Sequence, residues 1–308
     1  MSTTNHLHGK VCLVTGSTSG IGKVVALELA RMGAGVVVVA RDGERGEAAM
    51  SEIRAASGSR SVDLLLADLS SPSQVRRLAQ QFRERYGQLH VLIKNAGTIF
   101  PSRATTDEGL ETTFAVNHLA PFLLTNLLLD RLTASAPARI VNLASAAHHG
   151  VLDFGWLRGI KPRPRLFPNW RAYNQSKLAN ILFTYELARR LAGTGVTVNC
   201  LHPGMVATSA GSASRGAAGL VLNHLRPVLV RFFLGLPRTF LLTPEQGAAA
   251  LVFLASSPAV DGISGRYFVR TREARSSPRS SDVALARRLW RLDAELVGLD
   301  ESSSEDHR

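Results

Sequence analysis

The sequence predicts an α/β fold in which a single domain forms a doubly wound parallel sheet with helices on both faces. Short apolar runs rich in β-branched residues, each ending in glycine or polar residues, alternate with longer stretches of helical spacing over most of the 308 residues. Such runs are typical of strands buried on both faces, and parallel neighbours need a crossover, which is usually a helix. A hydrophobic content of 45% is enough for a sizeable core.

The expected elements follow one another in regular alternation. Strands are expected at residues 10–16, 35–41, 62–69, 90–97, 138–145 and 196–204. Helices are expected at residues 21–33, 45–57, 73–87, 109–132 and 173–195. A further amphipathic stretch over 282–299 predicts a helix that packs against the domain. We therefore expect one domain over residues 10–298, a flexible N-terminus over 1–9 and a disordered tail over 299–308.

Composition excludes several classes of protein. The net charge is +12, but the basic residues are scattered among apolar ones instead of clustering with aromatic residues, so no nucleic-acid partner is expected. Cys12 and Cys200 lie in apolar runs without zinc-ligand spacing, which predicts neither a metal site nor a disulfide framework. With no run of about 18 apolar residues and no signal-peptide core, we expect a cytoplasmic protein without a transmembrane segment. Peripheral contact with a membrane surface stays open.

A glycine-rich turn links the first expected strand to the first helix. Its spacing is G-x-x-x-G-x-G: Gly16 permits the tight turn, Gly20 lets the backbone approach a diphosphate, and Gly22 lets the helix pack close to the sheet. The helix N-terminus then offers free N–H groups to an anion. Strand, turn and helix together predict a dinucleotide site of Rossmann type. The turn contributes Gly16, Ser17, Thr18, Ser19, Gly20, Ile21 and Gly22 to the expected cofactor site.

The end of the second strand predicts which dinucleotide is bound. Arg41 stands nineteen positions after Gly22, where an arginine accommodates a 2′-phosphate and an acidic residue would bind a ribose hydroxyl. Asp42 follows and has two interpretations, because it could bind an NAD ribose or cap the next helix. We expect NADP(H) to be preferred over NAD(H).

A tyrosine and a lysine four residues apart form the centre of the expected catalytic site. Tyr173 and Lys177 share one face of a helix, so a nearby ammonium should lower the pKa of the phenol and make it a usable acid and base. Ser145, at the end of a strand, is suited to polarise a carbonyl oxygen. Asn117 lies in an apolar helix and could hold a proton-relay water or serve as a structural amide. A surface tyrosine near a surface lysine is the alternative interpretation of the pair.

These motifs together resemble those of the short-chain dehydrogenase/reductase family. The sequence around them is most similar to the retinol dehydrogenase branch of that family. The resemblance covers roughly residues 8 to 270. It rests on Thr15-Gly16-x-x-x-Gly20-x-Gly22, Asp68-Leu69, Asn95-Ala96-Gly97, Asn117, Ser145, Tyr173-x-x-x-Lys177 and Pro203-Gly204-Met205-Val206-Ala207-Thr208. Seven ordered motifs are far more specific than any single one.

The resemblance implies a role for each motif. Tyr173 would be the general acid and base, Lys177 would lower its pKa and hold the nicotinamide ribose, and Ser145 would steady the substrate oxygen. Asn117 would support the proton relay. The implied cofactor contacts are Asp68 and Leu69 at the adenine, Asn95, Ala96 and Gly97 at the adenosine ribose, and Pro203, Gly204, Val206 and Thr208 beside the nicotinamide.

Two positions depart from the family pattern. Lys94 stands where an asparagine is usual, and it could add to phosphate attraction or point to solvent. Ala144 replaces a serine that often precedes Ser145, with little consequence expected.

Substrate choice is expected to lie in residues 205–243, a segment of Leu, Val and Phe with interspersed Arg. A pocket lid, a membrane-surface patch and a dimer contact are the three interpretations of this segment, and the lid predicts a lipophilic alcohol, aldehyde or ketone as substrate. The expected activity is an NADP-dependent oxidoreductase, with homo-oligomers implied by the resemblance. The alternative is a catalytically silent dinucleotide-sensing or scaffold protein of the same fold.

Overall fold

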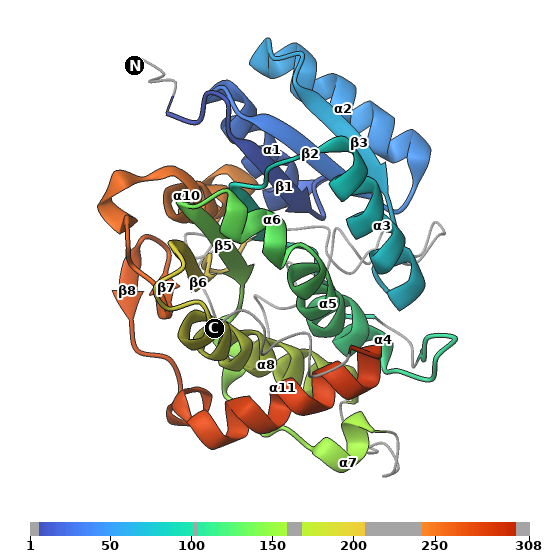
Figure 1. Ribbon diagram of the computed structural model, residues 1–308. Helices are drawn as coiled ribbons and strands as arrows, with labels where there is room; N and C mark the ends of the chain where they lie inside the picture. Colours follow the sequence, from blue (N-terminus) through green and yellow to red (C-terminus); the bar gives the residue numbers. More distant parts are fainter. Residues whose placement is uncertain (1–5, 101–103, 159–167, 207–241, 300–308) are drawn as a thin grey trace.

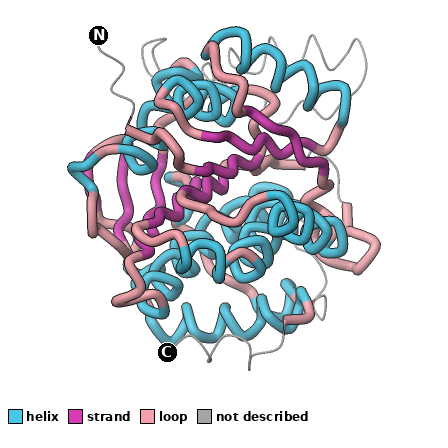
Figure 2. The backbone as a smooth tube through the Cα atoms, turned by 45° about the horizontal axis from the view of Figure 1, so that its top comes forward, coloured by secondary structure: helices cyan, strands magenta, loops and turns pink. Residues whose placement is uncertain are grey.

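The sheet forms the centre of the molecule, and helices cover both of its faces (Figures 1 and 2). This computed structural model describes residues 6–100, 104–158, 168–206 and 242–299. The strand order is β3-β2-β1-β4-β5-β6-β7-β8, with every pairing parallel except that of β7 with β8. The strands are β1 Val11–Thr15, β2 Gly35–Ala40, β3 Val62–Leu66, β4 Val91–Lys94, β5 Ala138–Leu143, β6 Val196–His202, β7 Arg266–Val269 and β8 Arg272–Ala274.

The helices form one layer on each face of the sheet. Helices α1 (Gly20–Arg31), α2 (Gly43–Ser57) and α10 (Pro244–Ser256) cover one face. The other face is covered by α3 (Pro72–Arg85), α5 (Ala120–Leu127) and α8 (Pro168–Arg190), and α11 (Val283–Val297) lies across α8 (Figure 1). Short elements complete the described chain: α4 Thr112–Phe114, the π-helix η1 Ala115–Leu119, α6 Leu129–Ala134, η2 Ala146–His148, α7 Phe154–Leu157, η4 Pro258–Val260 and η5 Pro278–Ser281.

The alternation of strand side chains explains why both faces are covered. In β1, Leu13 belongs to the core beneath α3, α5 and α8, whereas Cys12 and Val14 belong to the core beneath α1 and α10. Val37 and Val38 of β2 divide between the two cores in the same way. Because each central strand is apolar on both sides, each face buries a helical layer, as the sequence predicts for a parallel sheet.

The helix expected at 109–132 is in fact interrupted twice. A π-helical turn, η1, separates α4 from α5, and the chain breaks again at Leu128 before α6. Pro121 has no N–H and cannot donate to the carbonyl of Asn117 four residues earlier. The Asn117 carbonyl therefore lacks the usual N–H donor four residues later, and it lies in a π turn, a feature that is frequent at functional sites.

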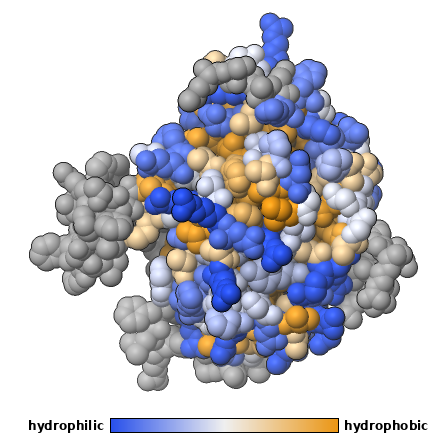
Figure 3. Space-filling view, turned by 90° about the vertical axis from the view of Figure 1, so that its left-hand side faces the viewer, coloured by the Kyte–Doolittle hydropathy of each residue, from blue (hydrophilic) through white to orange (hydrophobic). Residues whose placement is uncertain are grey.

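Several elements beyond β6 were not expected. Helix α10 opens with a capping box in which Thr243 accepts from the N–H of Gln246, and the Gln246 side chain accepts from the N–H of Thr243. Strand β7 extends the parallel sheet. Strand β8 closes its edge with Arg272 and Glu273, and charged side chains at an edge strand discourage further pairing. The face of the molecule on this side mixes hydrophilic and hydrophobic residues (Figure 3).

The structure describes part of each terminus that the sequence predicts to be flexible or disordered. In the stretch expected to be flexible, Leu7 is buried and its N–H donates to the carbonyl of Met32, so the N-terminal residues 6–9 are anchored; residues 1–5 lie outside the described residues. Of the expected tail, only Leu299 is described. No helix in the described part of the chain has both the length and the apolar character needed to cross a membrane.

Candidate active site

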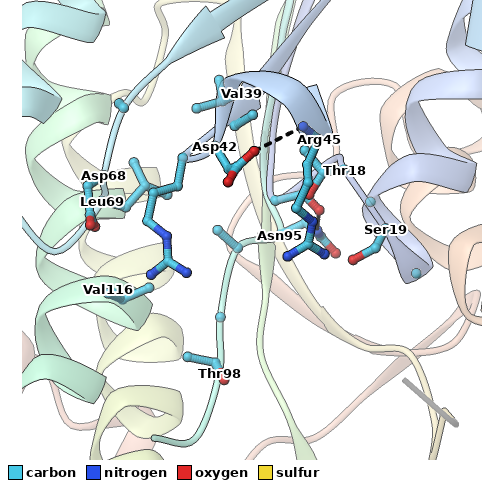
Figure 4. A pocket seen from close by; sticks show the side chains of 18 of the residues that line it. Thr18, Ser19, Val39, Asp42, Arg45, Asp68, Leu69, Asn95, Thr98 and Val116 are labelled. Carbon is cyan, nitrogen blue, oxygen red and sulfur yellow. Dashed lines mark hydrogen bonds between the residues drawn. The ribbon is translucent and has the colours of Figure 1, made fainter. Parts of the chain in front are cut away.

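A cavity of about 370 Å³ opens where the carboxyl ends of β1, β2, β3, β4 and β5 meet (Figure 4). Because parallel strands all end at the same edge of the sheet, the loops that follow them converge there. The cavity is lined by Gly16, Thr18, Ser19, Gly20, Ile21, Gly22, Val39, Ala40, Arg41, Asp42, Arg45, Ala67, Asp68, Leu69, Asn95, Ala96, Gly97, Thr98, Phe100, Val116 and Leu143. Twelve cofactor residues expected from the sequence are therefore brought together: Gly16, Thr18, Ser19, Gly20, Ile21, Gly22, Arg41, Asp68, Leu69, Asn95, Ala96 and Gly97.

The glycine turn is shaped by contacts that leave no room for side chains. A Cβ on Gly22 would stand 2.2 Å from the carbonyl oxygen of Gly16, and one on Gly16 would stand 2.8 Å from the Cα of Ala96. Gly20 has φ of 56°, in the left-handed region. The Asn95 amide also donates to the carbonyls of Thr15 and Gly16, both at 3.0 Å, and so joins the turn to the end of β4. The backbone surface of the cavity is therefore rigidly held.

Two arginines and one aspartate stand at the β2 end of the cavity. Arg41 and Arg45 are both exposed and both line it, and Figure 4 shows the Arg45 side chain beside Thr18 and Ser19. Asp42 is the N-cap of α2, where its carboxylate accepts from the N–H of Arg45 at 3.0 Å. Of the two interpretations of Asp42, the structure shows helix capping.

Some expected cofactor residues do not line this cavity. Ser17 is fully buried, and its hydroxyl donates to the carbonyl of Val14 and accepts from the N–H of Val39, so it ties β1 to β2. Pro203, Gly204 and Val206 leave the end of β6, where Val206 packs against Gly247 at the start of α10. Thr208 lies outside the described residues, as does most of the 205–243 segment, namely 207–241.

Tyr173 and Ser145 face each other across the end of β5. Tyr173 lies on α8, and the Ser145 side chain lies near enough to its hydroxyl to lower the pKa of the phenol. The Ser145 hydroxyl also accepts from the N–H of Ala147 at 3.2 Å. His148 fixes this loop, because its Nδ1 lies 2.7 Å from the Ser145 carbonyl and its Nε2 accepts from the N–H of Ser277. The expected phenol and polarising hydroxyl therefore lie close together.

Lys177 lies one helical turn after Tyr173 and is buried. Its Nζ donates to the carbonyl of Leu143 at 3.0 Å and lies 5.4 Å from the centroid of the Tyr173 ring. A Cβ on Gly97, which lines the cavity, would stand 3.4 Å from the same Nζ and 3.3 Å from the Asn117 amide oxygen. Lys177 therefore adjoins the cavity at Gly97, and the interpretation of this pair as two surface residues is wrong for Lys177.

The ionisation of the pair differs from the expectation. Burial raises the pKa of Tyr173 above its ordinary value, and the Ser145 side chain only partly opposes that rise. Burial also lowers the pKa of Lys177 to about 8. The expected lowering of the Tyr173 pKa is therefore wrong in direction, because desolvation of the phenol is the largest cause of the shift, and Tyr173 is protonated at neutral pH.

Asn117 lies in the π-helical turn and its side chain is fully engaged. The amide oxygen accepts from the N–H of Thr98 at 2.8 Å, and the amide nitrogen donates to the carbonyl of Thr98 and to the Ser176 hydroxyl. The carbonyl of Asn117 accepts from the Asn180 amide at 3.0 Å. The side chain therefore has a structural role, since it holds the loop after β4 against α8, and a role of Asn117 in a proton relay stays a prediction.

The two departures from the family pattern point away from the cavity. Lys94 is buried, donates from Nζ to the Thr125 hydroxyl at 2.7 Å and lies 4.3 Å from the centroid of the Phe183 ring. Burial lowers the pKa of Lys94 well below its ordinary value. Neither phosphate attraction nor a solvent position is correct, because β4 directs this side chain into the core beneath α5 and α8. Ala144 is also buried.

Sequence reasoning missed several residues of the site. Arg45 lies in the first turn of α2, directly after the strand end that carries Arg41, and this position could have placed it at the same cavity. Pro121 could have indicated that the carbonyl of Asn117 lacks its usual helical donor, because the missing N–H falls four residues later. Thr98 and Asn180 carried no signal, since their roles depend on contacts between distant segments.

The cavity fits a nicotinamide dinucleotide. Glycines of the turn line it and leave their backbone groups uncovered by side chains, two arginines also line it, and Lys177 lies beside the lining residue Gly97. The fold and the cavity together define a dinucleotide-dependent oxidoreductase class. Comparison with known proteins, by sequence and by structure, supports this class.

Residues 10–155 match the short chain dehydrogenase model, and residues 163–270 match the enoyl-(acyl carrier protein) reductase model. The chain is 42% identical over 298 residues to human retinol dehydrogenase 13, covering 96% of this chain and 86% of that protein. It is 43% identical over 296 residues to bovine (Bos taurus) retinol dehydrogenase 12, covering 95% and 88%. The chain therefore belongs to the short-chain dehydrogenase family, whose members are oxidoreductases acting on CH–OH groups.

Solved structures agree with this assignment. An uncharacterized protein from Mycobacterium paratuberculosis has a TM-score of 0.73 and 31% identity, covering 97% of this chain and 98% of that one. The NADP active-site complex of RhlG from Pseudomonas aeruginosa has a TM-score of 0.68 and 28% identity, covering 87% and 97%.

Proposed function

We propose that the protein is an NADP(H)-dependent oxidoreductase that interconverts a lipophilic alcohol and its aldehyde or ketone, with Tyr173 as general acid and base. The observation that carries this proposal is the placement of the Tyr173 hydroxyl. It lies near the Ser145 side chain, and its neighbour Lys177 lies beside Gly97, which lines the cavity. A carbonyl oxygen placed between the phenol and the serine would meet one proton donor and one polarising group.

The residues divide the reaction between them. When bound, the nicotinamide ring supplies or accepts the hydride. In carbonyl reduction, the Tyr173 hydroxyl transfers its proton to the substrate oxygen while Ser145 hydrogen-bonds the same oxygen. Lys177 stabilises the phenolate left on Tyr173 and would be the residue that holds the nicotinamide ribose. Because its pKa is raised, Tyr173 holds the proton that this direction needs at neutral pH.

Three observations support NADP(H) over NAD(H). Arg41 and Arg45 are exposed at one end of the cavity and could hold a 2′-phosphate by charge-assisted hydrogen bonds. The carboxylate of Asp42 caps α2 through the N–H of Arg45 and is engaged there. Related structures, including the RhlG complex, contain NADP.

Replacement of either arginine tests the preference for NADP(H). We expect native protein to bind NADPH more tightly than NADH. Arg41→Ala and Arg45→Ala should each weaken NADPH by about tenfold, since a hydrogen bond to a charged group contributes about 1.5–3 kcal/mol, and should leave NADH nearly unchanged. Titration of each variant by nicotinamide fluorescence measures this, with Arg60→Ala as an exposed arginine outside the cavity lining. Equal affinity of the native protein for the two cofactors would refute the preference.

A lipophilic substrate is supported by the surroundings of Tyr173 and by the relatives. Trp170 is 52% exposed and its ring stacks on that of Tyr173, with centroids 5.6 Å apart. An exposed indole beside the proposed acid offers apolar area to a substrate. Curated relatives with about 40% identity are named retinol dehydrogenases.

A screen of carbonyl compounds tests the activity. Aliphatic aldehydes of increasing chain length, aromatic aldehydes, retinal and ketones would be incubated with NADPH, and its oxidation followed optically. We expect kcat/KM to rise with apolar area. If all carbonyls are inert while NADPH binds tightly, the alternative of a dinucleotide sensor is the better description.

A further inference from the structure

A chain of buried polar side chains connects the C-terminal helix to Lys177. Asp293 of α11 is 1% exposed, and its Oδ2 lies 2.7 Å from Nε2 of His118, which is fully buried in η1. Nδ1 of His118 lies 2.9 Å from the amide oxygen of Asn180 on α8. The Asn180 amide nitrogen donates to the carbonyls of Asn117, at 3.0 Å, and Leu143, at 3.4 Å.

The last link of this chain is shared with the proposed catalytic lysine. The carbonyl of Leu143 accepts from both the Asn180 amide and the Lys177 ammonium, the latter at 3.0 Å. Leu143 also lines the cavity. The orientation of Asn180 therefore affects the group that holds Lys177 in place.

The hydrogen-bond donors and acceptors along this chain of side chains determine which nitrogen of His118 carries a proton. The Asn180 nitrogen faces two carbonyls, so its oxygen must face His118, and His118 must carry a proton on Nδ1. Nε2 then either donates to a carboxylate as part of an imidazolium or accepts from a protonated carboxyl. In both cases one proton lies between His118 and Asp293, and the buried pair has no net charge. Burial raises the pKa of Asp293, and the His118 ring opposes that rise.

The surroundings give this pair a fixed position. Trp290 of α11 packs on Phe122 and Phe183, with ring centroids 5.0 and 5.6 Å away. Arg76 donates to the carbonyls of Val297 and Gly298 and so caps the end of α11. The helix is thus held against α5 and α8, and Asp293 cannot move away from His118 without disturbing an aromatic cluster.

We propose that Asp293 is a positioning residue for the active site: through His118 it sets the proton on Nδ1, and through Asn180 it aligns the Leu143 carbonyl and the Lys177 ammonium. This proposal rests on the proposed oxidoreductase function for its effect on turnover. Its structural part, which concerns the His118 proton and the hold on Lys177, can be measured without turnover.

Three variants separate positioning from packing. Asp293→Ala removes the partner of Nε2. Asp293→Asn has the same shape, and its amide N–H can donate to Nε2 of a neutral His118 that keeps its Nδ1 proton. Leu289→Ala is the matched control, since Leu289 is a buried residue of α11 outside the polar chain, and its loss should lower stability without touching the chain.

We expect Asp293→Ala to lower kcat by at least about tenfold, the loss typical of residues that orient a functional group through an intermediary. NADPH should bind several-fold more weakly, because Lys177 is misaligned, and the KM of the carbonyl should change little. Asp293→Asn should restore kcat to within about threefold of the native value. Leu289→Ala should lower the melting temperature about as much as Asp293→Ala and keep both kcat and NADPH affinity.

The proposal is overturned if Asp293→Ala keeps its kcat, if Asp293→Asn loses as much as Asp293→Ala, or if Leu289→Ala loses kcat to the same degree. Nitrogen-15 NMR of the histidine side chains tests the proposal without measuring turnover. We expect His118 of the native protein to carry its proton on Nδ1, and an unprotonated Nδ1 also overturns the proposal. A native protein that is inert with every carbonyl contradicts the proposed function alone, and NADPH affinity and the His118 spectrum then decide the positioning role.

Discussion

At the scale of single residues, burial governs the chemistry of the site more than sequence spacing does. The four-residue interval correctly predicts that Tyr173 and Lys177 share a face of α8. It does not predict that burial raises the pKa of Tyr173 and lowers that of Lys177, because depth depends on β5, η1 and the loop after β4. Lys94 shows the same limit, since its motif suggests the cofactor and its strand directs it into the core.

The lowered pKa of Lys177 predicts a pH dependence. Below about 8 the side chain is an ammonium ion that can stabilise the Tyr173 phenolate, and as pH rises through about 8 that charge is lost. Tyr173, with its raised pKa, stays protonated over this range. We expect kcat for carbonyl reduction to be level below this pH and to fall above it, up to about tenfold per pH unit.

Steady-state rates between pH 6 and pH 10 with saturating NADPH measure this fall. Lys177→Arg is the control, because a guanidinium keeps its charge throughout, so its lower activity should not fall near pH 8. A native rate that rises through pH 8 in the reductive direction would contradict the assignment of the ammonium.

At the scale of elements, the glycine turn and the interrupted helix position the site, and they differ in how visible they are in the sequence. The turn between β1 and α1 is predictable because three glycines with a strand before and a helix after have few other uses. The π turn at Asn117 is less visible, since 109–132 has an unbroken helical pattern and only Pro121 marks the change. Helix α10 was not expected, although Thr243 and Gln246, three residues apart, have the spacing of a capping box.

Substitution of Gly22 by alanine tests the role of the turn. The new Cβ would lie 2.2 Å from the carbonyl oxygen of Gly16 and 2.3 Å from the Asn95 amide nitrogen, so α1 or the turn must move. We expect NADPH affinity to fall by at least about tenfold and stability by about 1–3 kcal/mol, the usual cost of overpacking. Titration with NADPH and thermal unfolding measure the two effects.

Gly87→Ala is the matched control for this substitution, because a Cβ at Gly87 meets no atom within 4 Å. It should bind NADPH as the native protein does. If Gly22→Ala also binds normally, the turn does not approach the cofactor in the way its geometry indicates.

At the scale of the whole molecule, the parallel sheet gathers the site from segments far apart in the chain. The strand order places the ends of β1, β2, β3, β4 and β5 around one cavity, so the motifs that follow those strands meet there as the sequence predicts. Contacts between the layers are not predictable in this way. His118 and Asp293 are 175 residues apart, and each looks ordinary in its own helix. Only the packing of α11 across α8 reveals that they form a pair.

The central claim is that the Tyr173 hydroxyl carries the proton while the rest of the molecule binds the cofactor. Tyr173→Phe removes that one oxygen and keeps the ring that stacks on Trp170. The direct measurement is NADPH affinity and kcat of this variant beside the native protein. We predict affinity within about threefold of native and a kcat lower by at least about 100-fold, as expected when a general acid is removed. A variant that binds NADPH and still turns over at a rate near that of the native protein would contradict the account.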